Sequence, residues 1–480
     1  MLKILMAASE ASPYAKTGGL ADVLGSLPAA LLKQGADVRV IMPKYSSIPS
    51  ELKEGIHHRC YSYVRMGWRN QYCGIEEAEY RGVTYYFIDN QYYFNRDNLY
   101  GYGDDGERFA FFCQAVLAAL HQLDFIPDVL HCHDWQAGMI PVLLEAKYRC
   151  QEPYHNIATM FSIHNLKYQG VYGMNHFNDW FSLGEEFFTP DKLEFYGGAS
   201  FLKGGLLYSH ILTTVSQSYA NEIQNSFYGE QMDGLLRARQ NSLHGIVNGI
   251  DYEEFNPETD PLLYCTFSKD NMDGKKENKI NLQRDLQLPV DGELPMIGLI
   301  SRLVDQKGLD LIAHVLGDIL RYPVQLVVLG SGSEKYERLF QDAVNQYPGK
   351  VSANIRFDNT LAHRIYAGAD LFLMPSLFEP CGLGQMISMR YGTLPIVRET
   401  GGLLDTVNAY NEYTGEGNGF RFHNYNAHEM LFTIERALHL YQNKEVWSKL
   451  QYAAMSSDYS WQVSACRYMD LYQSLHHYFQ

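Results

Sequence analysis

Segments that predict β-strands alternate with segments that predict α-helices in the first half of the chain, and the alternation restarts in the second half. The apolar run Lys3–Ala8 predicts a strand, which is followed by helical spacing over Leu20–Gln34 and by another strand at Asp37–Met42. In the second half, the strand Pro295–Ile300 precedes the helical segment Leu309–Leu320. This alternation predicts an α/β protein in which each half has a parallel sheet covered by helices on both faces.

The length of 480 residues supports more than one domain, because a single core stops growing beyond about 250–300 residues. We expect an N-terminal domain over residues 1–244, a second domain over 245–460 and a helix over 461–480 that packs back on the first domain. Further predicted elements are the strands Val83–Ile88, Val129–His131, Gln325–Leu329 and Asp370–Met374 and the helices Arg108–His121, Gln136–Tyr148 and Trp461–Phe479.

The net charge of −16 argues against a partner that needs a basic face, such as nucleic acid or an anionic membrane surface. The eight cysteines are scattered and form no CxxC pair, which indicates reduced thiols and a cytoplasmic protein. No apolar run is long enough for a membrane span, and the apolar start ends ahead of Glu10, which favours a buried strand over a signal peptide. The sequence leaves the oligomeric state open.

A glycine-containing loop, Lys16-Thr17-Gly18-Gly19, lies between the first strand and the first helix. Glycines allow close approach of the backbone to a ligand, and a helix N-terminus attracts phosphate. Lys16 would add a full positive charge. The alternative interpretation is a plain strand–helix turn, since the loop lacks the spacing of known phosphate-binding motifs.

A second loop after a strand carries two cations, Arg302 and Lys307. Ligands of open α/β sheets bind at the carboxyl ends of strands, where these cations would hold a diphosphate and stabilise charge on a leaving phosphate. A solvated basic loop is the alternative.

Polar groups also follow two apolar runs of the first half. On a strand, His131 and His133 would lie on one face and Asp134 on the other. No distant ligand set completes a metal site, so we expect no metal; Asp134 is a candidate acceptor for sugar hydroxyls. His164, after Ile157–Ile163, is a second polar residue at a strand end. Either motif could instead be a structural hydrogen-bonding site.

The loop Glu379-Pro380-Cys381-Gly382-Leu383-Gly384 follows the predicted strand Asp370–Met374. A glutamate here could accept bonds from vicinal hydroxyls, or could complement a helix dipole. Cys381 has no paired histidine evident from the sequence, so a nucleophile role is not supported.

As an ordered set, these motifs resemble those of bacterial glycogen synthases and plant starch synthases. The similarity rests on KTGGLADV (16–23), HCHDWQAG (131–138), IHNLKYQG (163–170), VNGID (247–251), SRLVDQKG (301–308), FEPCGLGQ (378–385) and RYGTLPIV with TGGL (390–403). The family consists of retaining glucosyltransferases of GT-B architecture, with two Rossmann-like domains whose parallel sheets face each other across a cleft. The resemblance implies ADP-glucose as donor, the non-reducing end of an α-1,4-glucan such as glycogen as acceptor, and no cofactor.

The resemblance also implies roles for individual residues. Arg302 and Lys307 would hold the diphosphate, Glu379 would bind glucose hydroxyls, and the His164 carbonyl would stabilise the oxocarbenium-like centre as the fourth catalytic group. The implied donor-binding residues are Lys16, Gly18, Gly19, Asp134, Asn248, Phe357, Cys381, Gly382 and Leu383, with Phe357 on the adenine. The chain departs from the family pattern at Gly384, where the family often has Thr or Ser. At Ile387, many related transferases carry a second Glu, and its absence here is consistent with the glycogen synthase branch.

Neither an evident base for inverting transfer nor a carboxylate for double displacement is found among these motifs, which favours front-face transfer. The alternatives are a related GT-B enzyme with another donor, or a non-catalytic protein that binds glucan or a sugar nucleotide. A glucan phosphorylase would require a pyridoxal lysine that the sequence does not frame. The presence of Lys16, Arg302, Lys307 and Glu379 argues against a non-catalytic binding protein. A measurement of glucosyl transfer would distinguish an enzyme from such a protein.

Overall fold

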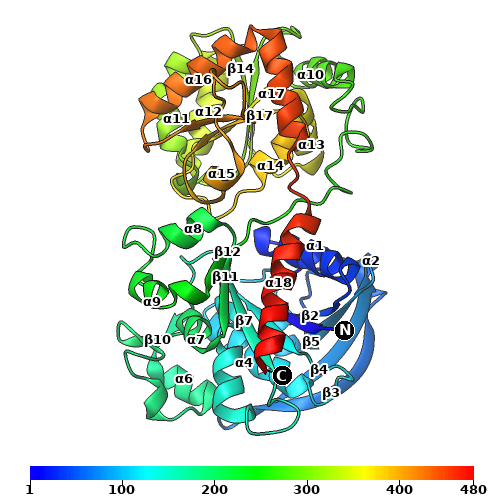
Figure 1. Cartoon of the computed structure of the whole chain (residues 1–480), viewed down its shortest axis with the longest axis vertical. Helices are drawn as coiled ribbons and strands as arrows, with labels where there is room; N and C mark the ends of the chain where they lie inside the picture. The colour runs from blue at the N-terminus through cyan, green and yellow to red at the C-terminus, as the bar shows by residue number, and fades with distance from the viewer. Residues whose placement is uncertain (480) are drawn as a thin grey trace. The chain divides into compact units, whose positions relative to one another are not determined.

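A computed structural model, which describes residues 1–479 and the side chains of residues 1–476, divides the chain into two compact units (Figure 1). Unit 1 comprises Met1–Gly249 together with the C-terminal segment from Trp461, and unit 2 comprises Ile250–Ser460. The division after Gly249 lies a few residues beyond the boundary expected near residue 245. Among the described residues, no helix is both long and apolar enough to cross a membrane.

Unit 1 is built on a nine-stranded sheet in which seven neighbouring strands are parallel, as the sequence predicts. Their order is β12 (Leu243–Gly245), β11 (Ile211–Thr214), β7 (Ala158–Ile163), β6 (Val129–His133), β1 (Lys3–Ala7), β2 (Asp37–Pro43) and β5 (Val83–Asp89). The buried ends of these strands, such as Ile4–Ala7, form near-continuous apolar runs because helices cover both faces.

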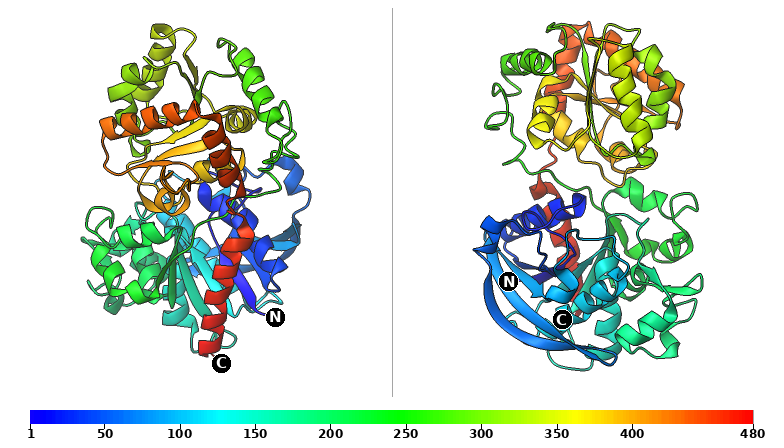
Figure 2. Two further views of the ribbon diagram at one scale, coloured as in Figure 1. Left: turned by 45° about the horizontal axis from the view of Figure 1, so that its top comes forward. Right: turned by 180° about the vertical axis from the view of Figure 1, so that it is seen from behind.

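One edge of the unit 1 sheet carries two antiparallel strands in addition to the predicted parallel ones. An antiparallel hairpin of β3 (His57–Met66) and β4 (Arg69–Tyr80) continues the sheet beyond β5, and Figure 2 shows it as a long curved pair. One face of the hairpin buries Val64, Met66 and Cys73, while Tyr61 and Tyr63 on the other face are exposed. This alternation is typical of an antiparallel edge with one wet face.

The helical segments of unit 1 include two that the sequence predicts to within a few residues, α1 (Gly19–Lys33) and α4 (Asp105–Ala119). The expected helix 136–148 is instead a 3₁₀ turn (Trp135–Ala137), α5 (Met139–Leu143) and a π-helical turn (Leu144–Tyr148). A Cβ on Gly138 would lie 2.2 Å from the Phe201 carbonyl oxygen, so this segment packs tightly against the start of α7 (Phe201–Tyr208). The others are α2 (Ser50–Lys53), α3 (Gln91–Phe94), α6 (Met174–Phe181), α8 (Gln217–Glu222), α9 (Asp233–Ala238) and the 3₁₀ turns Glu185–Phe187 and Gln240–Ser242.

The last helix, α18 (Trp461–Phe479), packs within unit 1 beside α1 (Figure 1). Gln34 at the end of α1 donates from Nε2 to the Gln462 carbonyl (3.2 Å), and the Tyr472 hydroxyl lies 2.6 Å from His131 Nδ1 on β6. A three-stranded sheet of β8 (Val171–Tyr172), β10 (Gly198–Ser200) and β9 (Glu194–Phe195) completes the unit.

Unit 2 contains a six-stranded, fully parallel sheet. Its order is β15 (Val351–Asn354), β14 (Gln325–Leu329), β13 (Met296–Ile300), β16 (Leu371–Met374), β17 (Leu394–Arg398) and β18 (Phe420–Phe422). The chain moves outward from β13 to β15 and then returns to place β16 on the other side of β13. The strand order therefore reverses between β13 and β16, the point where open α/β sheets bind ligands.

The helices of unit 2 alternate with these strands, as crossover connections between parallel strands require. They are α10 (Asp273–Asp285), α11 (Leu309–Ile319), α12 (Glu334–Gln346), α13 (Asn359–Gly368), α14 (Gly384–Arg390), α15 (Gly401–Thr406), α16 (Ala427–Tyr441) and α17 (Lys444–Ser456). A buried cluster of Leu282, Val327, Leu329 and Ile365 joins α10 and α13 to the sheet.

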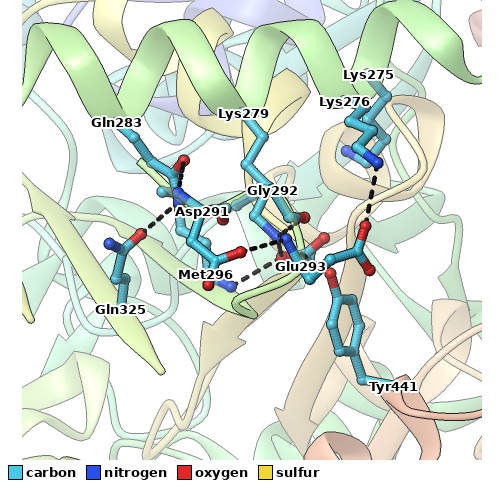
Figure 3. Close-up of polar contacts among 12 residues, drawn as sticks. Lys275, Lys276, Lys279, Gln283, Asp291, Gly292, Glu293, Met296, Gln325 and Tyr441 are labelled. Carbon is cyan, nitrogen blue, oxygen red and sulfur yellow. Dashed lines mark hydrogen bonds and ion pairs between the residues drawn. The ribbon is translucent and has the colours of Figure 1, made fainter. Parts of the chain in front are cut away.

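Polar side chains attach α10 to the sheet (Figure 3), and this helix is not among the elements that the sequence predicts. Lys279 pairs with Asp370 (Nζ–Oδ2, 2.8 Å), and Gln283 Nε2 donates to Gln325 Oε1 (2.8 Å). The buried Lys275 ammonium donates to two backbone carbonyls and to Thr393, and burial lowers its pKa to about 7. A helix held by buried polar groups shows no apolar periodicity, which is why the pattern concealed it.

Candidate active site

A cavity of about 240 Å³ opens in unit 2 where the sheet order reverses. Its walls come from the carboxyl ends of β13 and β16 and from the loops that follow them. Five of the predicted site residues line it: Arg302, Lys307, Glu379, Gly382 and Leu383. Residues that lie more than 70 positions apart in the sequence therefore share one pocket at the ligand-binding edge of the sheet.

The loop of Lys307 is fixed against the loop of Glu379 by backbone contacts. Leu377 N–H donates to the Gln306 carbonyl (2.9 Å), and Gln306 Nε2 donates to the Phe378 carbonyl (3.2 Å). Gly308 has φ of +69°, and a Cβ there would lie 1.9 Å from the Pro375 oxygen, so only glycine allows this approach. As a result, Lys307 Nζ lies 2.6 Å from Glu379 Oε2.

Glu379 is held from a second side by residues that the sequence analysis missed. Ser376 Oγ donates to Glu379 Oε2 (3.0 Å). The buried Arg398 donates from Nε to the Ser376 carbonyl (2.8 Å) and also binds the Leu377 carbonyl. Ser376 lies in the loop after β16, and Arg398 is the last residue of β17. The sequence did not indicate that either side chain would support Glu379.

The backbone from Cys381 to Leu383 is also held in a defined conformation. Gln385 Nε2 donates to the carbonyls of Cys381 (3.0 Å) and Gly382 (2.9 Å). A Cβ on Gly402 would lie 2.0 Å from the Cys381 oxygen, so the start of α15 packs directly on this loop. Burial of Cys381 fits a backbone role for this segment better than a nucleophile.

Two predicted site residues of unit 2, Arg302 and Phe357, are exposed, unlike the Lys307–Glu379 pair. Arg302 lines the cavity with an exposed side chain that has no partner among the described residues. Phe357 is 90% exposed on the loop between β15 and α13 and does not line this cavity. At Gly384, a Cβ would lie 2.9 Å from the Phe372 ring, so the space that a Thr or Ser would need is occupied.

In unit 1, the loop that precedes α1 is organised by Glu10. Thr17 donates to Glu10 Oε2 from both its backbone N–H (2.5 Å) and its hydroxyl (2.9 Å). Burial raises the pKa of Glu10, and these hydrogen bonds oppose the shift. Lys16 is half-exposed and pairs with Asp22 (2.5 Å). A Cβ on Gly19 would meet nothing within 4 Å, so packing inside the unit does not require glycine at that position.

Asp134 and His164 meet at the ends of β6 and β7. Asp134 Oδ1 accepts a hydrogen bond from the His164 N–H (2.7 Å), and Asp134 has a strained positive φ of 56°. Burial raises the pKa of Asp134 to about 7, while hydrogen bonds from the backbone N–H groups of His164 and Asn165 lower it. The carboxylate thus orients the peptides around His164. Since N–H and C=O point in opposite directions in a trans peptide, binding of the Asn165 N–H directs the His164 carbonyl away from Asp134.

His131 and His133 share one face of β6, as predicted, with ring centroids 4.0 Å apart. Burial lowers the pKa of both imidazoles well below the usual range, and it lowers the pKa of His164 to about 3. Groups of His, Cys, Asp and Glu that could hold a metal ion are absent from the part of the chain that the structure describes. The last predicted residue of unit 1, Asn248, is buried, and its Oδ1 has no hydrogen-bond partner among the described residues.

Comparisons with known proteins agree with this arrangement. Residues 3–238 match the family model described as the starch synthase catalytic domain, and residues 284–453 match that of glycosyl transferases group 1. Glycogen synthases of Desulforamulus reducens and Clostridium acetobutylicum are 56% and 55% identical to the chain. Each alignment covers 99% of this chain. It covers 99% of the Desulforamulus reducens protein and 100% of the Clostridium acetobutylicum protein.

Among solved structures, the catalytic domain of starch synthase IV from Arabidopsis thaliana, bound to ADP and acarbose, matches with a TM-score of 0.92 and 34% identity over 99% of both chains. Sucrose-phosphate synthase from Thermosynechococcus elongatus shares the fold, with a TM-score of 0.63 at 16% identity over 99% of both chains. The two α/β units are those of a GT-B glycosyltransferase. Within that class, the chain belongs to the family of bacterial glycogen synthases and plant starch synthases.

Proposed function

We propose that the chain transfers glucose from ADP-glucose to the non-reducing end of an α-1,4-glucan, with retention of configuration. The observation that carries the proposal is the cavity of unit 2, in which Lys307 and Glu379 form a pair beside the exposed guanidinium of Arg302. A diphosphate needs fixed cations, and a sugar needs a hydrogen-bond acceptor for its hydroxyls. This cavity supplies both kinds of group from rigid loops.

The proposed reaction proceeds on the front face of the sugar. The bond between the anomeric carbon and the diphosphate oxygen breaks as the acceptor hydroxyl approaches from the same side. The new glycosidic bond forms there, and the hydroxyl proton passes to the departing diphosphate oxygen. Arg302 and Lys307 stabilise the negative charge that develops on this leaving group. Glu379 binds the glucose hydroxyls, and Lys307 holds this carboxylate in place through their 2.6 Å contact.

Residues of unit 1 complete the proposed assignment. Lys16 and the amides of Gly18 and Gly19 bind donor phosphate, and the absence of any packing requirement at Gly19 supports a ligand-related reason for the glycine. Asp134 orients the His164 peptides, so that the His164 carbonyl stabilises positive charge at the anomeric centre. Asn248 offers an unpartnered buried oxygen for a sugar hydroxyl.

Two finer assignments depend on the donor. Phe357 stacks on adenine, and its 90% exposed ring is available for this contact. The backbone from Cys381 to Leu383 binds glucose, with Gln385 holding it in position. We place the reaction in the cytoplasm, where the eight thiols, none of which forms a disulfide within the described part of the chain, would stay reduced.

Radiolabelled transfer to glycogen tests the donor and the activity together. We expect much faster incorporation from ADP-glucose than from UDP-glucose at equal concentration, with the new linkage in the α configuration. Equal rates or a preference for UDP-glucose would contradict the donor assignment. Absence of transfer from either nucleotide, with retained ADP binding, would support the non-catalytic alternative.

A further inference from the structure

Three histidines of unit 1 lie in contact near the ends of β6 and β7. The His131 and His133 rings are tilted by 34° at a centroid distance of 4.0 Å, and the His133 and His164 centroids are 5.3 Å apart. His133 Nδ1 lies 3.0 Å from His164 Nε2, which is a hydrogen-bonding distance. Of these three, only His164 has a role in the proposed function, so the purpose of the other two needs a separate explanation.

The His133–His164 contact joins two neutral rings, because burial lowers the pKa of each imidazole far below neutrality. A neutral imidazole carries one N–H donor and one acceptor nitrogen. The contact therefore has two possible arrangements: either His133 donates from Nδ1, or His164 donates from Nε2. The choice fixes the tautomer of both rings.

The remaining nitrogen of His133 decides between the two arrangements. His133 Nε2 is buried and has no hydrogen-bond partner among the described residues. If His164 donated, the proton of His133 would sit on this nitrogen as a buried donor without an acceptor. If His133 donates, Nε2 is only an unused acceptor, and orphaned acceptors are tolerated better than orphaned donors. The second arrangement is therefore more stable.

We propose that His133 is a positioning residue that donates from Nδ1 to His164 Nε2, and that it thereby fixes His164 as the tautomer with its proton on Nδ1. His164 then offers a bound sugar one hydrogen-bond donor from its side chain and no free acceptor nitrogen. The consequence for the sugar rests on the proposed function, whereas the tautomer itself is a property of the free protein. The ligand group that fits is a hydroxyl oxygen acting as acceptor.

His131 holds the ring of His133 in place without competing for its protons. Both nitrogens of His131 already have partners: Nδ1 lies 2.6 Å from the Tyr472 hydroxyl on α18, and Nε2 lies 2.7 Å from Ser162 Oγ on β7. Because its nitrogens are occupied, His131 presents only its ring face to His133. The C-terminal helix thus supports the orientation of His164 through the contacting rings of His131 and His133.

Long-range ¹H–¹⁵N correlation spectra of the full chain, labelled with ¹⁵N-histidine and free of ligand, test the tautomer directly. The His164 signals are assigned by their loss in His164→Gln. We expect wild-type His164 to be protonated at Nδ1 and unprotonated at Nε2 at neutral pH. Protonation at Nε2, or an equal mixture of tautomers, would overturn the proposal. No substrate is present, so this result is independent of the transferase assignment.

Two substitutions at His133 then link the tautomer to turnover. His133→Asn retains an N–H close to the position of Nδ1, and His133→Leu removes it. We expect His133→Leu to give a mixture of His164 tautomers and to lower kcat/KM by about tenfold, the worth of one hydrogen bond. His133→Asn should retain the Nδ1–H tautomer and stay within about threefold of wild type. The exposed His58 provides the control, His58→Leu. An unchanged tautomer in His133→Leu, or equal losses in both variants, would contradict a positioning role.

Discussion

The two units place their predicted site residues at the same point of the sheet but use opposite chemistry. In unit 1, the loops that follow β1 and β6 lie where the strand order reverses, and in unit 2 the same is true of β13 and β16. Unit 2 presents full charges, with Lys307 and Glu379 paired and Arg302 exposed. Around His164, unit 1 presents neutral imidazoles and oriented peptides, with Asp134 buried beneath them.

This difference separates two tasks of a group transfer. Ionic side chains can neutralise a charge that leaves, as a diphosphate does. Neutral, buried and rigid groups define positions and stabilise a reacting centre without holding it in a strong ionic bond. We therefore expect substitutions of the unit 2 cations Arg302 and Lys307 to affect handling of the diphosphate, and substitutions around His164 to affect the sugar. The predictions below test this separation, in order of decreasing effect.

Lys307→Ala should have the largest effect, a loss of about 10²–10³ in kcat that exceeds the rise in donor KM, because charge on the diphosphate grows in the transition state. Steady-state transfer to glycogen measures both constants. Arg302→Lys, which keeps the charge but loses the planar fork, should be partly tolerated. Lys335, in an exposed pair with Asp305 (2.6 Å), offers a matched control in Lys335→Ala. Near-wild-type turnover of folded Lys307→Ala would remove Lys307 from the mechanism.

Asp134→Asn should lower kcat by about tenfold or more, since the amide replaces one of the two acceptor oxygens of the carboxylate with an NH₂ donor. The raised pKa of Asp134, about 7, also predicts that wild-type turnover rises with pH through 7 as the carboxylate forms. The variant should lack this rise. A pH profile of kcat that is identical in the two proteins would contradict the role of the carboxylate.

Asp134 should also lower the free energy of unfolding at neutral and higher pH. In the folded state Asp134 holds its proton up to about pH 7, whereas the unfolded chain releases it near pH 4. Its contribution to the free energy of unfolding therefore falls as pH rises from about 4 to 7 and stays low above 7. We expect urea unfolding at pH 8 to show Asp134→Asn as stable as wild type or more stable, by up to several kcal/mol. A marked loss of stability at that pH would show that the charge is compensated elsewhere.

Thr17→Val should have a smaller effect, a rise in donor KM of a few fold with kcat within about twofold. The hydroxyl contact to Glu10 is lost, while the backbone N–H contact remains. Thr414→Val, on an exposed loop of unit 2, serves as control. A large fall in kcat with unchanged KM would place this loop in the chemical step.

Exhaustive chelation should have the smallest effect, with activity unchanged within error. Arg302 and Lys307 supply the positive charge that a divalent ion would otherwise bring to the diphosphate. Transfer assays with and without EDTA measure this. Loss of activity that added divalent ion restores would show that the cations of unit 2 are not sufficient.

The sequence predicted much of the parallel core, because buried strand segments such as Ile4–Ala7 and Leu326–Leu329 form apolar runs between helical patterns. It did not predict the hairpin β3–β4, whose apolar pattern is weak because one face of the hairpin is exposed. It also did not predict helix α10, whose apolar pattern is weak because buried lysines anchor this helix. The motifs identified Lys307 and Glu379 as candidate site residues. They did not predict that the two side chains contact each other, or that Ser376 and Arg398 support Glu379, because these contacts depend on how separate loops pack.

Titration calorimetry of ADP tests the separation of tasks most directly, because ADP contains the diphosphate but no glucose. We predict that Lys307→Ala weakens ADP binding by about tenfold or more, while Asp134→Asn binds ADP within twofold of wild type although its transfer activity is reduced. Equal ADP affinity in wild type and Lys307→Ala, or an equal loss in both variants, would contradict the assignment of Lys307 to the diphosphate and of the groups around His164 to the sugar.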